Sequence, residues 1–229
     1  MAVAFDAVGP SSAGGGTANG SPSTSTSWSH TCSGTNRVVV VGVAVGVNPS
    51  GSVTTSVTYG GTAMTSVGKV GSNNNTLGYV QLFSLVNPPT GASTVAVSAS
   101  VVTYISGGSI SFTGASGVGT AVTAFGSSTT PTATVTGTAS GGMVVSAACC
   151  GSPIASSAQT GRWLKNTNNN TAAGNGAGAT APAGGSVTMS HTVTSDWWGI
   201  VAVEVLAAAS PVAPADPGLL VSRLRPYFG

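Results

Sequence analysis

The stretch VVVVGVAVGV, residues 38–47, decides the fold class of this chain. β-Branched valines lose side-chain freedom in a helix and fit the pleated surface of a sheet. In the second half of the stretch valine alternates with glycine or alanine, which is the two-residue period of a strand. The segment is therefore predicted to be a central strand with one bulky face and one small face, onto which a second sheet or a neighbouring backbone can pack closely.

Similar short runs recur outward from this stretch, separated by segments rich in Gly, Pro, Ser or Asn. Residues 54–67 are predicted to form a hairpin, because Gly60-Gly61 supplies the positive φ angles of a tight turn. The run 77–86 places Val80 and Leu82 on one face and ends at the turn signal NPPTG, residues 87–91. Further strands are predicted at 94–98, 110–113, 118–125, 132–136, 143–149, 161–165, 186–193 and 198–206.

This spacing of strands is typical of an all-β antiparallel sandwich of two sheets. We predict a jelly-roll type, with 38–47 and 198–206 as central, neighbouring strands. Residues 11–25 and 166–185 are predicted to be loops because of their low complexity. Within the second loop, residues 174–178 resemble a nucleotide-binding loop, but no helical pattern follows them, so that interpretation is rejected.

The end of the chain differs from the rest. Residues 1–207 are predicted to be one β-sandwich domain, and 208–217, AASPVAPADP, a semi-rigid Pro/Ala linker. Residues 218–229, GLLVSRLRPYFG, are too short to fold alone. They are predicted to be an extended tail that docks on a partner or on its own domain, against the alternative of a frayed end. The docking residues are Leu219, Leu220, Arg223, Leu224, Arg225, Tyr227 and Phe228.

Only 4% of the 229 residues are charged, and the net charge is +2. A typical soluble protein has about 25% charged residues, and so little charge favours self-association. Either hydroxyl and amide side chains cover the surface, or other chains bury much of it. The basic residues are scattered, so no nucleic-acid partner is expected. No apolar run approaches the length of a transmembrane helix, and residues 1–6 do not have the pattern of a secretion signal.

Few side chains are available for catalysis. The carboxylates are Asp6, Asp196, Glu204 and Asp216. Asp196 and Glu204 are the closest pair, but along a strand they would lie about 26 Å apart, too far to act together. His30 and His191 could join a serine and Asp196, yet no G-x-S-x-G motif occurs. No metal-binding spacing of Cys and His is present. The chain is therefore predicted not to be an enzyme and to use no cofactor and no metal.

The cysteines and tryptophans are interpreted mainly as packing residues. Cys32, Cys149 and Cys150 are predicted to be buried small hydrophobes, with the adjacent pair on opposite faces of a strand and unable to bridge. Trp197 and Trp198 should likewise point in opposite directions. The outward ring is a candidate contact for a sugar or a protein partner, although packing of both rings in the core or between subunits is the more common arrangement.

Four stretches together resemble a known group of proteins. They are SVTYGGTAMT at 56–65, LFSLVNPPTG at 82–91, TVAVS at 94–98 and SDWWG at 195–199. The series resembles β-sandwich virion structural proteins of tailed bacteriophages of actinobacteria and of related prophages, of the minor tail or capsid-associated type. The resemblance covers roughly residues 35–206. Its motifs are strands and turns, so it implies no active-site residues.

The expected function is that of a structural subunit of a tailed-phage virion, either a minor tail protein or a capsid decoration protein. Its expected partners are other virion proteins and copies of itself, in a virion assembled in the host cytoplasm. Uncharged faces can pack together without the cost of desolvating ions. In the tail, Arg223 and Arg225 would pair with carboxylates of the partner. The alternative is a carbohydrate-binding module that recognises host-surface glycan through Trp197 or Trp198.

Overall fold

The computed structural model describes residues 1–10, 17–18, 22–46, 53–72, 78–167 and 174–210, and the fold below refers to these ranges. Eighteen strands make up the fold, and every strand pairing is antiparallel. No helix in these ranges is long and apolar enough to span a bilayer. The predicted all-β antiparallel sandwich is therefore confirmed.

The first half of the chain forms one hydrogen-bonded sheet that folds over into two layers. Its strands are β1 (Ala4–Gly9), β2 (Thr17–Ala18), β3 (Ser23–Cys32), β4 (Val38–Gly46), β5 (Thr55–Tyr59), β6 (Thr62–Ala63), β7 (Thr65–Gly71), β8 (Tyr79–Val86) and β9 (Gly91–Thr113). The first part of β9 lies between β3 and β5, and its second part lies between β1 and β4. The inner layer thus has the order β1-β9-β4-β8-β7.

The second half builds the same two layers from separate strands. They are β10 (Ala115–Val118), β11 (Val122–Ser128), β12 (Thr132–Thr138), β13 (Met143–Cys150), β14 (Ile154–Ser157), β15 (Thr160–Lys165), β16 (Asn175–Pro182), β17 (Gly185–Val193) and β18 (Asp196–Ala207). The inner layer has the order β11-β18-β13-β16-β15, with β10 also on β18, and the outer layer has the order β12-β17-β14. Strands β17 and β18 together take the place that β9 takes in the first half.

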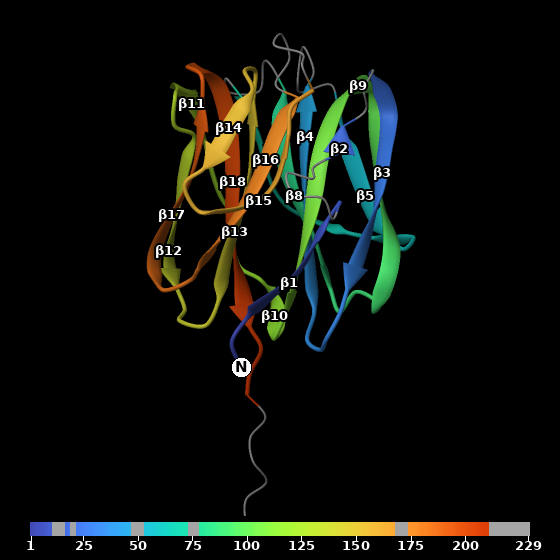
Figure 1. The fold of residues 1–229 in the computed structure, drawn as a ribbon, viewed down its shortest axis with the longest axis vertical. Helices are drawn as coiled ribbons and strands as arrows, with labels where there is room; N and C mark the ends of the chain where they lie inside the picture. The colour runs from blue at the N-terminus through green and yellow to red at the C-terminus, as the bar shows by residue number, and fades with distance from the viewer. Residues whose placement is uncertain (11–16, 19–21, 47–52, 73–77, 168–173, 211–229) are drawn as a thin grey trace, which may run out of the picture.

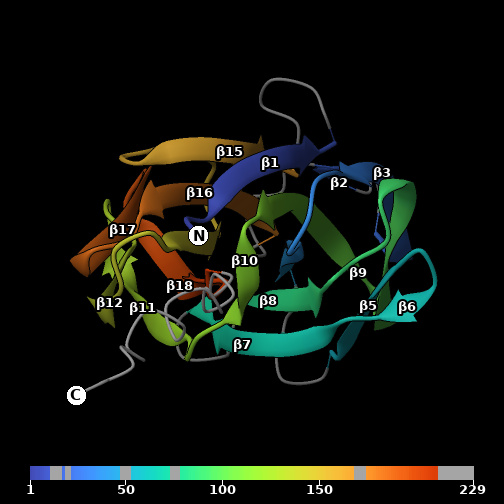
Figure 2. The same ribbon diagram turned by 90° about the horizontal axis from the view of Figure 1, so that it is seen from below.

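The two halves therefore repeat one arrangement, and they stand side by side in Figure 1. Their inner layers face each other, so that β4 contacts β13 and β16, and β8 contacts β13 and β18. Two seams run where the edges of these layers meet. Seen from below in Figure 2, β1 lies beside β15 at one seam, and β7 lies beside β11 at the other.

Three apolar cores separate the four layers. The central core, between the two inner layers, includes Val38, Val80, Leu82, Val145 and Val203. A second core fills the first half and a third fills the second half. All nine residues of β4 are buried, because the strand has a core on each side. The two sheets of the expected sandwich thus correspond to the inner layers, each with a further layer on its outer face.

A tryptophan packs against the small face of β4. The alternation of valine with small residues predicted that another segment would pack closely there. Trp163 of β15 is 3% exposed and lies against glycines of three strands. A Cβ atom would stand 2.7 Å from the Trp163 ring at Gly42, 2.4 Å at Gly108 and 2.0 Å at Gly178. Real Cβ atoms do not approach other atoms so closely, so glycine at these positions makes room for the ring.

Two predictions about local structure are confirmed. Gly60 and Gly61 have φ angles of 55° and 82° and connect β5 to β6 in the expected hairpin. Val80 and Leu82 of β8 face the central core, while Tyr79 and Phe83 face the core of the first half.

Other sequence predictions are wrong. Strands 38–47 and 198–206 are central but not neighbours, because each half of the chain pairs with itself: β4 lies between β8 and β9, and β18 pairs with β13. The loop predicted at 166–185 contains β16, a strand that is almost entirely buried. The loop predicted at 11–25 overlaps β3, which begins at Ser23. Residues 94–98 and 110–113 belong to the single strand β9, and 118–125 is divided between β10 and β11.

Candidate protein interface

His30 of β3 lies in a buried polar cluster inside the first half. Its Nδ1 is 2.8 Å from the hydroxyl oxygen of Ser109, which also accepts a 2.9 Å hydrogen bond from Trp28 Nε1. Nε2 of His30 is buried and has no hydrogen-bond partner within the described ranges. Burial lowers the pKa of His30 to about 4, against a smaller opposing effect of Asp6. The ring is thus kept neutral and shielded from solvent.

Asp6 of β1 anchors the turn after β3. Its carboxylate accepts hydrogen bonds from the Ser33 backbone N–H at 2.9 Å, the Ser111 hydroxyl at 2.7 Å and the Ser33 hydroxyl. Burial opposes ionisation, but these hydrogen bonds outweigh it and hold the pKa of Asp6 below its usual value. The charge of Asp6 therefore stabilises the fold.

His191 of β17 occupies a corresponding buried position in the second half. Its Nδ1 is 2.8 Å from the Ser157 hydroxyl and its Nε2 is 3.3 Å from the Ser146 hydroxyl. Burial lowers its pKa to about 4. The ring shares its strand face with buried Met189 and Val193, as predicted. His191 is thus bonded to two serines rather than to Asp196.

Asp196 and Glu204 lie on the uninterrupted strand β18, which keeps them apart as predicted. Asp196 accepts hydrogen bonds from the Ser152 hydroxyl and the Trp197 backbone N–H, each at 2.7 Å. Glu204 accepts one from the Ala139 backbone N–H, also at 2.7 Å. Within the part of the chain that the structure describes, no group of three or more His, Cys, Asp or Glu side chains could hold a metal ion.

The three cysteines are free and buried, as predicted. Cys149 faces the central core and Cys150 the core of the second half, so the adjacent thiols point to opposite sides of β13. Burial raises the pKa of each of these two thiols to about 12. Thiols of this kind are inert packing groups.

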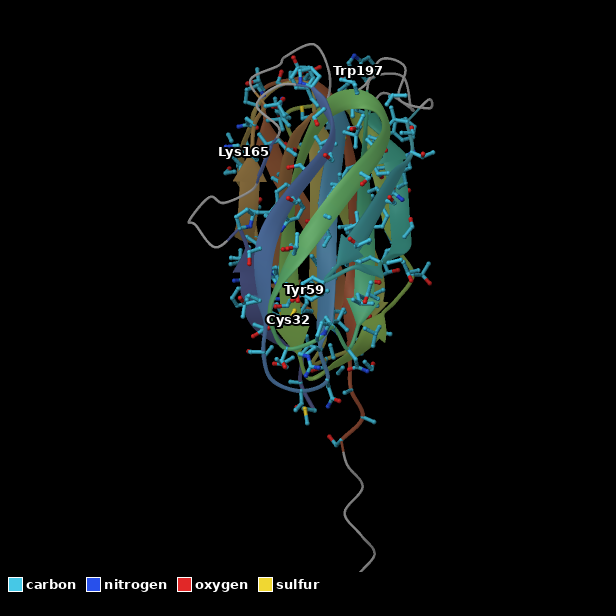
Figure 3. All side chains as sticks on the ribbon, turned by 90° about the vertical axis from the view of Figure 1, so that its right-hand side faces the viewer. Cys32, Tyr59, Lys165 and Trp197 are labelled. Carbon is cyan, nitrogen blue, oxygen red and sulfur yellow. The ribbon has the colours of Figure 1, made fainter. Side chains whose placement is uncertain are left out.

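Trp197 and Trp198 also point in opposite directions, as predicted. Trp198 is 7% exposed and its Nε1 donates a 3.0 Å hydrogen bond to the Ser128 hydroxyl. Trp197 is 40% exposed and stands at the upper end of the molecule, with Lys165 a little below it (Figure 3). Of this pair, only Trp197 is free to contact a partner.

The opposite, lower end holds both ends of the described chain. The Met1 amino group donates to the Ala208 carbonyl at 3.2 Å and to the Ser210 hydroxyl at 2.8 Å. The predicted docking residues lie outside the described ranges, on the segment that continues from Ser210: Leu219, Leu220, Arg223, Leu224, Arg225, Tyr227 and Phe228.

The β7–β11 seam carries a row of partly exposed apolar side chains that the sequence analysis did not single out. We call it the apolar row: Val67, Val70, Val86, Val118, Ala121 and Phe125. Phe125 is 48% exposed and Val86 44%, while the other four pack partly buried against the central core. The row could not be recognised beforehand because it forms only where the edges of the two halves meet.

The equivalent β1–β15 seam is closed by a charged side chain. The Arg162 guanidinium lies 3.7 Å from the centroid of the Phe5 ring, and Arg162 Nε donates a 2.7 Å hydrogen bond to the Thr180 hydroxyl. This contact joins the two halves and covers part of Phe5, which remains 37% exposed. The two seams are thus alike in architecture, but Arg162 stacks on Phe5 at one, whereas Phe125 stays 48% exposed at the other.

Comparison of the chain with protein-family models, curated proteins and solved structures finds no match.

Proposed function

We propose that this chain is a structural subunit of a tailed-phage virion, a minor tail protein or a capsid decoration protein, that works by packing against other virion proteins and copies of itself. The observation that carries the proposal is the exposure of large apolar side chains on a surface almost without charge. Val86, Phe125 and Trp197 are 40–48% exposed, while only 4% of all residues are charged. Such a surface gains from burial at about 25 cal/mol per Å² and has few ions to desolvate.

The roles of the titratable groups support the same proposal. Asp6, Asp196 and Glu204 accept hydrogen bonds from neighbouring loops and strands of the fold. His30 and His191 are held neutral in the cores of the two halves. The carboxylates thus hold loops and strands of the fold together and the imidazoles are packed in its cores, as expected of a subunit that works by packing.

Purified phage particles test the proposal. Quantitative mass spectrometry should find this chain in the particle fraction at a fixed ratio to the major virion proteins, and labelled antibody should mark one site by electron microscopy. A chain shortened to residues 1–207 should be lost from particles, because the predicted docking tail is removed. Absence of the full chain from purified particles would contradict the proposal, and normal occupancy of the shortened chain would contradict the docking role of residues 208–229.

The exposed Trp197 supports a second candidate, recognition of host-surface glycan. An indole ring that is 40% exposed at one end of the molecule can stack on the apolar face of a sugar. On a glycan array, replacement of Trp197 by alanine should then abolish binding, while Phe125→Ala, which also removes an exposed ring, should leave it unchanged. Equal binding by both variants, or no binding by the parent chain, would exclude this candidate.

A further inference from the structure

The apolar row is an open extension of the central core. Phe125 pairs with Gly199, so both positions point to the same face of the sheet. A Cβ at Gly199 would lie 3.2 Å from Val70 Cγ1. Val118 pairs in the same way with Val205, which belongs to the central core. Phe125 therefore stands just beyond Val70, at the edge where the inner layers stop covering each other.

Strands β7, β8, β10 and β11, which carry the row, contain a single charged residue, Lys69, and Arg37 beside the Val86 end donates its hydrogen bonds to the carbonyls of Pro88 and Gly34. Lys69, the one charged residue of β7, is turned to the other side of its strand: its Nζ lies 3.7 Å from the Tyr79 ring centroid and 3.3 Å from the Val53 carbonyl oxygen. At the equivalent seam, by contrast, Arg162 stacks on Phe5. The β7–β11 seam therefore lacks two things that a docked segment could supply: a cation over Phe125 and apolar cover for the valines of the row.

The chain leaves the fold at the lower end of this same seam. The Ala208 backbone N–H donates a 2.8 Å hydrogen bond to the Gly114 carbonyl, next to the start of β10. The sequence that follows contains the residue types that could cover the row. Residues 218–229 include three leucines, two aromatic residues and two arginines.

We propose that the apolar row is the docking site for residues 218–229 of a second copy of this chain. Leucine and aromatic side chains of the tail cover the valines of the row, and Arg223 or Arg225 stacks on Phe125 as Arg162 stacks on Phe5. Because the tail of one copy enters the row of the next, the contact is heterologous and links copies into an open or ring-shaped series.

The spacer favours a second copy over the chain's own row. Residues 211–217 include Pro211, Pro214 and Pro217, a composition that predicts an extended spacer of about 20 Å at about 3.1 Å per residue. A tail that covered its own row could start at the exit point, beside β10, and would need no such spacer. A spacer of the length that this composition predicts would instead let the docking residues reach a neighbouring copy.

Complementation in solution tests this inference. One variant ends after Ser210 and keeps the row, all described strands and the Met1 contact. The other keeps the tail but carries Val86→Ser and Phe125→Ser, both at exposed positions. In sedimentation velocity, the parent chain should associate with rising concentration and each variant should stay monomeric. An equimolar mixture should form a one-to-one complex and nothing larger, because each partner supplies one half of the contact.

The matched control is Trp197→Ala, which removes an exposed ring at the upper end and should leave association unchanged. A parent chain that stays monomeric, a mixture that does not form the complex, or loss of association in Trp197→Ala would each overturn the inference. So would a labelled peptide of residues 211–229 that binds the shortened chain while the parent chain remains monomeric, since the tail would then cover its own row.

This inference rests on the proposed function in assuming that the chain works by packing against proteins, but the two can fail separately. If the chain is found in virions yet the mixture does not complement, the tail binds another virion protein and only the self-association is wrong. If the mixture complements but the chain is absent from particles, the docking contact stands and the virion role is wrong.

Discussion

At the scale of single residues, the glycines around Trp163 leave no room for a larger side chain. A methyl group at Gly178 would stand 2.0 Å from Trp163 Nε1 and 2.6 Å from Cε2, so the ring or the strand must move. Overpacking of a rigid core costs about 1–3 kcal/mol and occasionally more. We therefore expect Gly178→Ala to lower the free energy of unfolding by about 3 kcal/mol, measured by urea denaturation.

The control for this prediction is Gly161→Ala on β15, where a new Cβ would meet only Ser157 atoms at 3.9 Å. It should change stability little. In a Trp163→Ala background the penalty of Gly178→Ala should vanish, because the clashing ring is gone. A penalty of the same size with and without the ring would show that the glycine acts through its backbone rather than through the tryptophan.

At the scale of strands, the sequence allowed prediction wherever a short run of large apolar or β-branched residues stands between turn-forming segments. Strands β4, β8, β13 and β17 were found in this way, and the opposite orientations of Trp197 and Trp198 followed from the two-residue period of a strand. Strand β16 was missed because its residues, NGAGATAP, lack bulky side chains. The two-residue period was nevertheless present, since Gly176 and Gly178 face Trp163 while Ala177, Ala179 and Ala181 face the core of the second half.

The repetition of the arrangement was also missed, although one signal of it exists in the sequence. The tetrapeptide NNNT occurs at 73–76 and again at 168–171, in each case shortly before the strand that flanks the centre of its inner layer, β8 or β16. Without this signal, β4 and β18 were expected to be neighbouring central strands, which they are not. Pairing within each half takes precedence since it joins segments that are closer in the chain and closes shorter loops.

At the scale of the whole molecule, the candidate interface could not be foreseen from the sequence, because it depends on how two complete halves meet. Phe125 and Val86 lie far apart in the chain and come from different halves, and nothing in the sequence indicates that they line the same seam. The same is true of Phe5 and Arg162 at the other seam. The tail was recognised by its composition alone, while a surface for it to bind became apparent only from the packing of the two halves.

The same division into halves makes a prediction for acid stability, because each half buries one histidine. The pKa is about 4 for both His30 and His191 in the fold, against 6.5 for a free side chain. Below pH 6.5 the two imidazoles bind protons in the unfolded chain, whereas in the folded chain they bind them only near pH 4. Stability is therefore complete above pH 6.5 and is lost as the pH falls toward 4, by about 1.4 kcal/mol per pH unit for each histidine.

Urea unfolding at pH 7, 6 and 5 measures this loss, and the steepest change should fall between pH 6 and 5. The carboxylate of Asp6, whose pKa is held below its usual value, loses its contribution only at lower pH and does not mask the effect. A double variant, His30→Gln with His191→Gln, cannot bind these protons and should show nearly constant stability from pH 7 to 5, whatever its absolute value. If the variant lost stability as steeply as the parent chain, the buried imidazoles would not be the source, and the two halves would owe their acid sensitivity to another group.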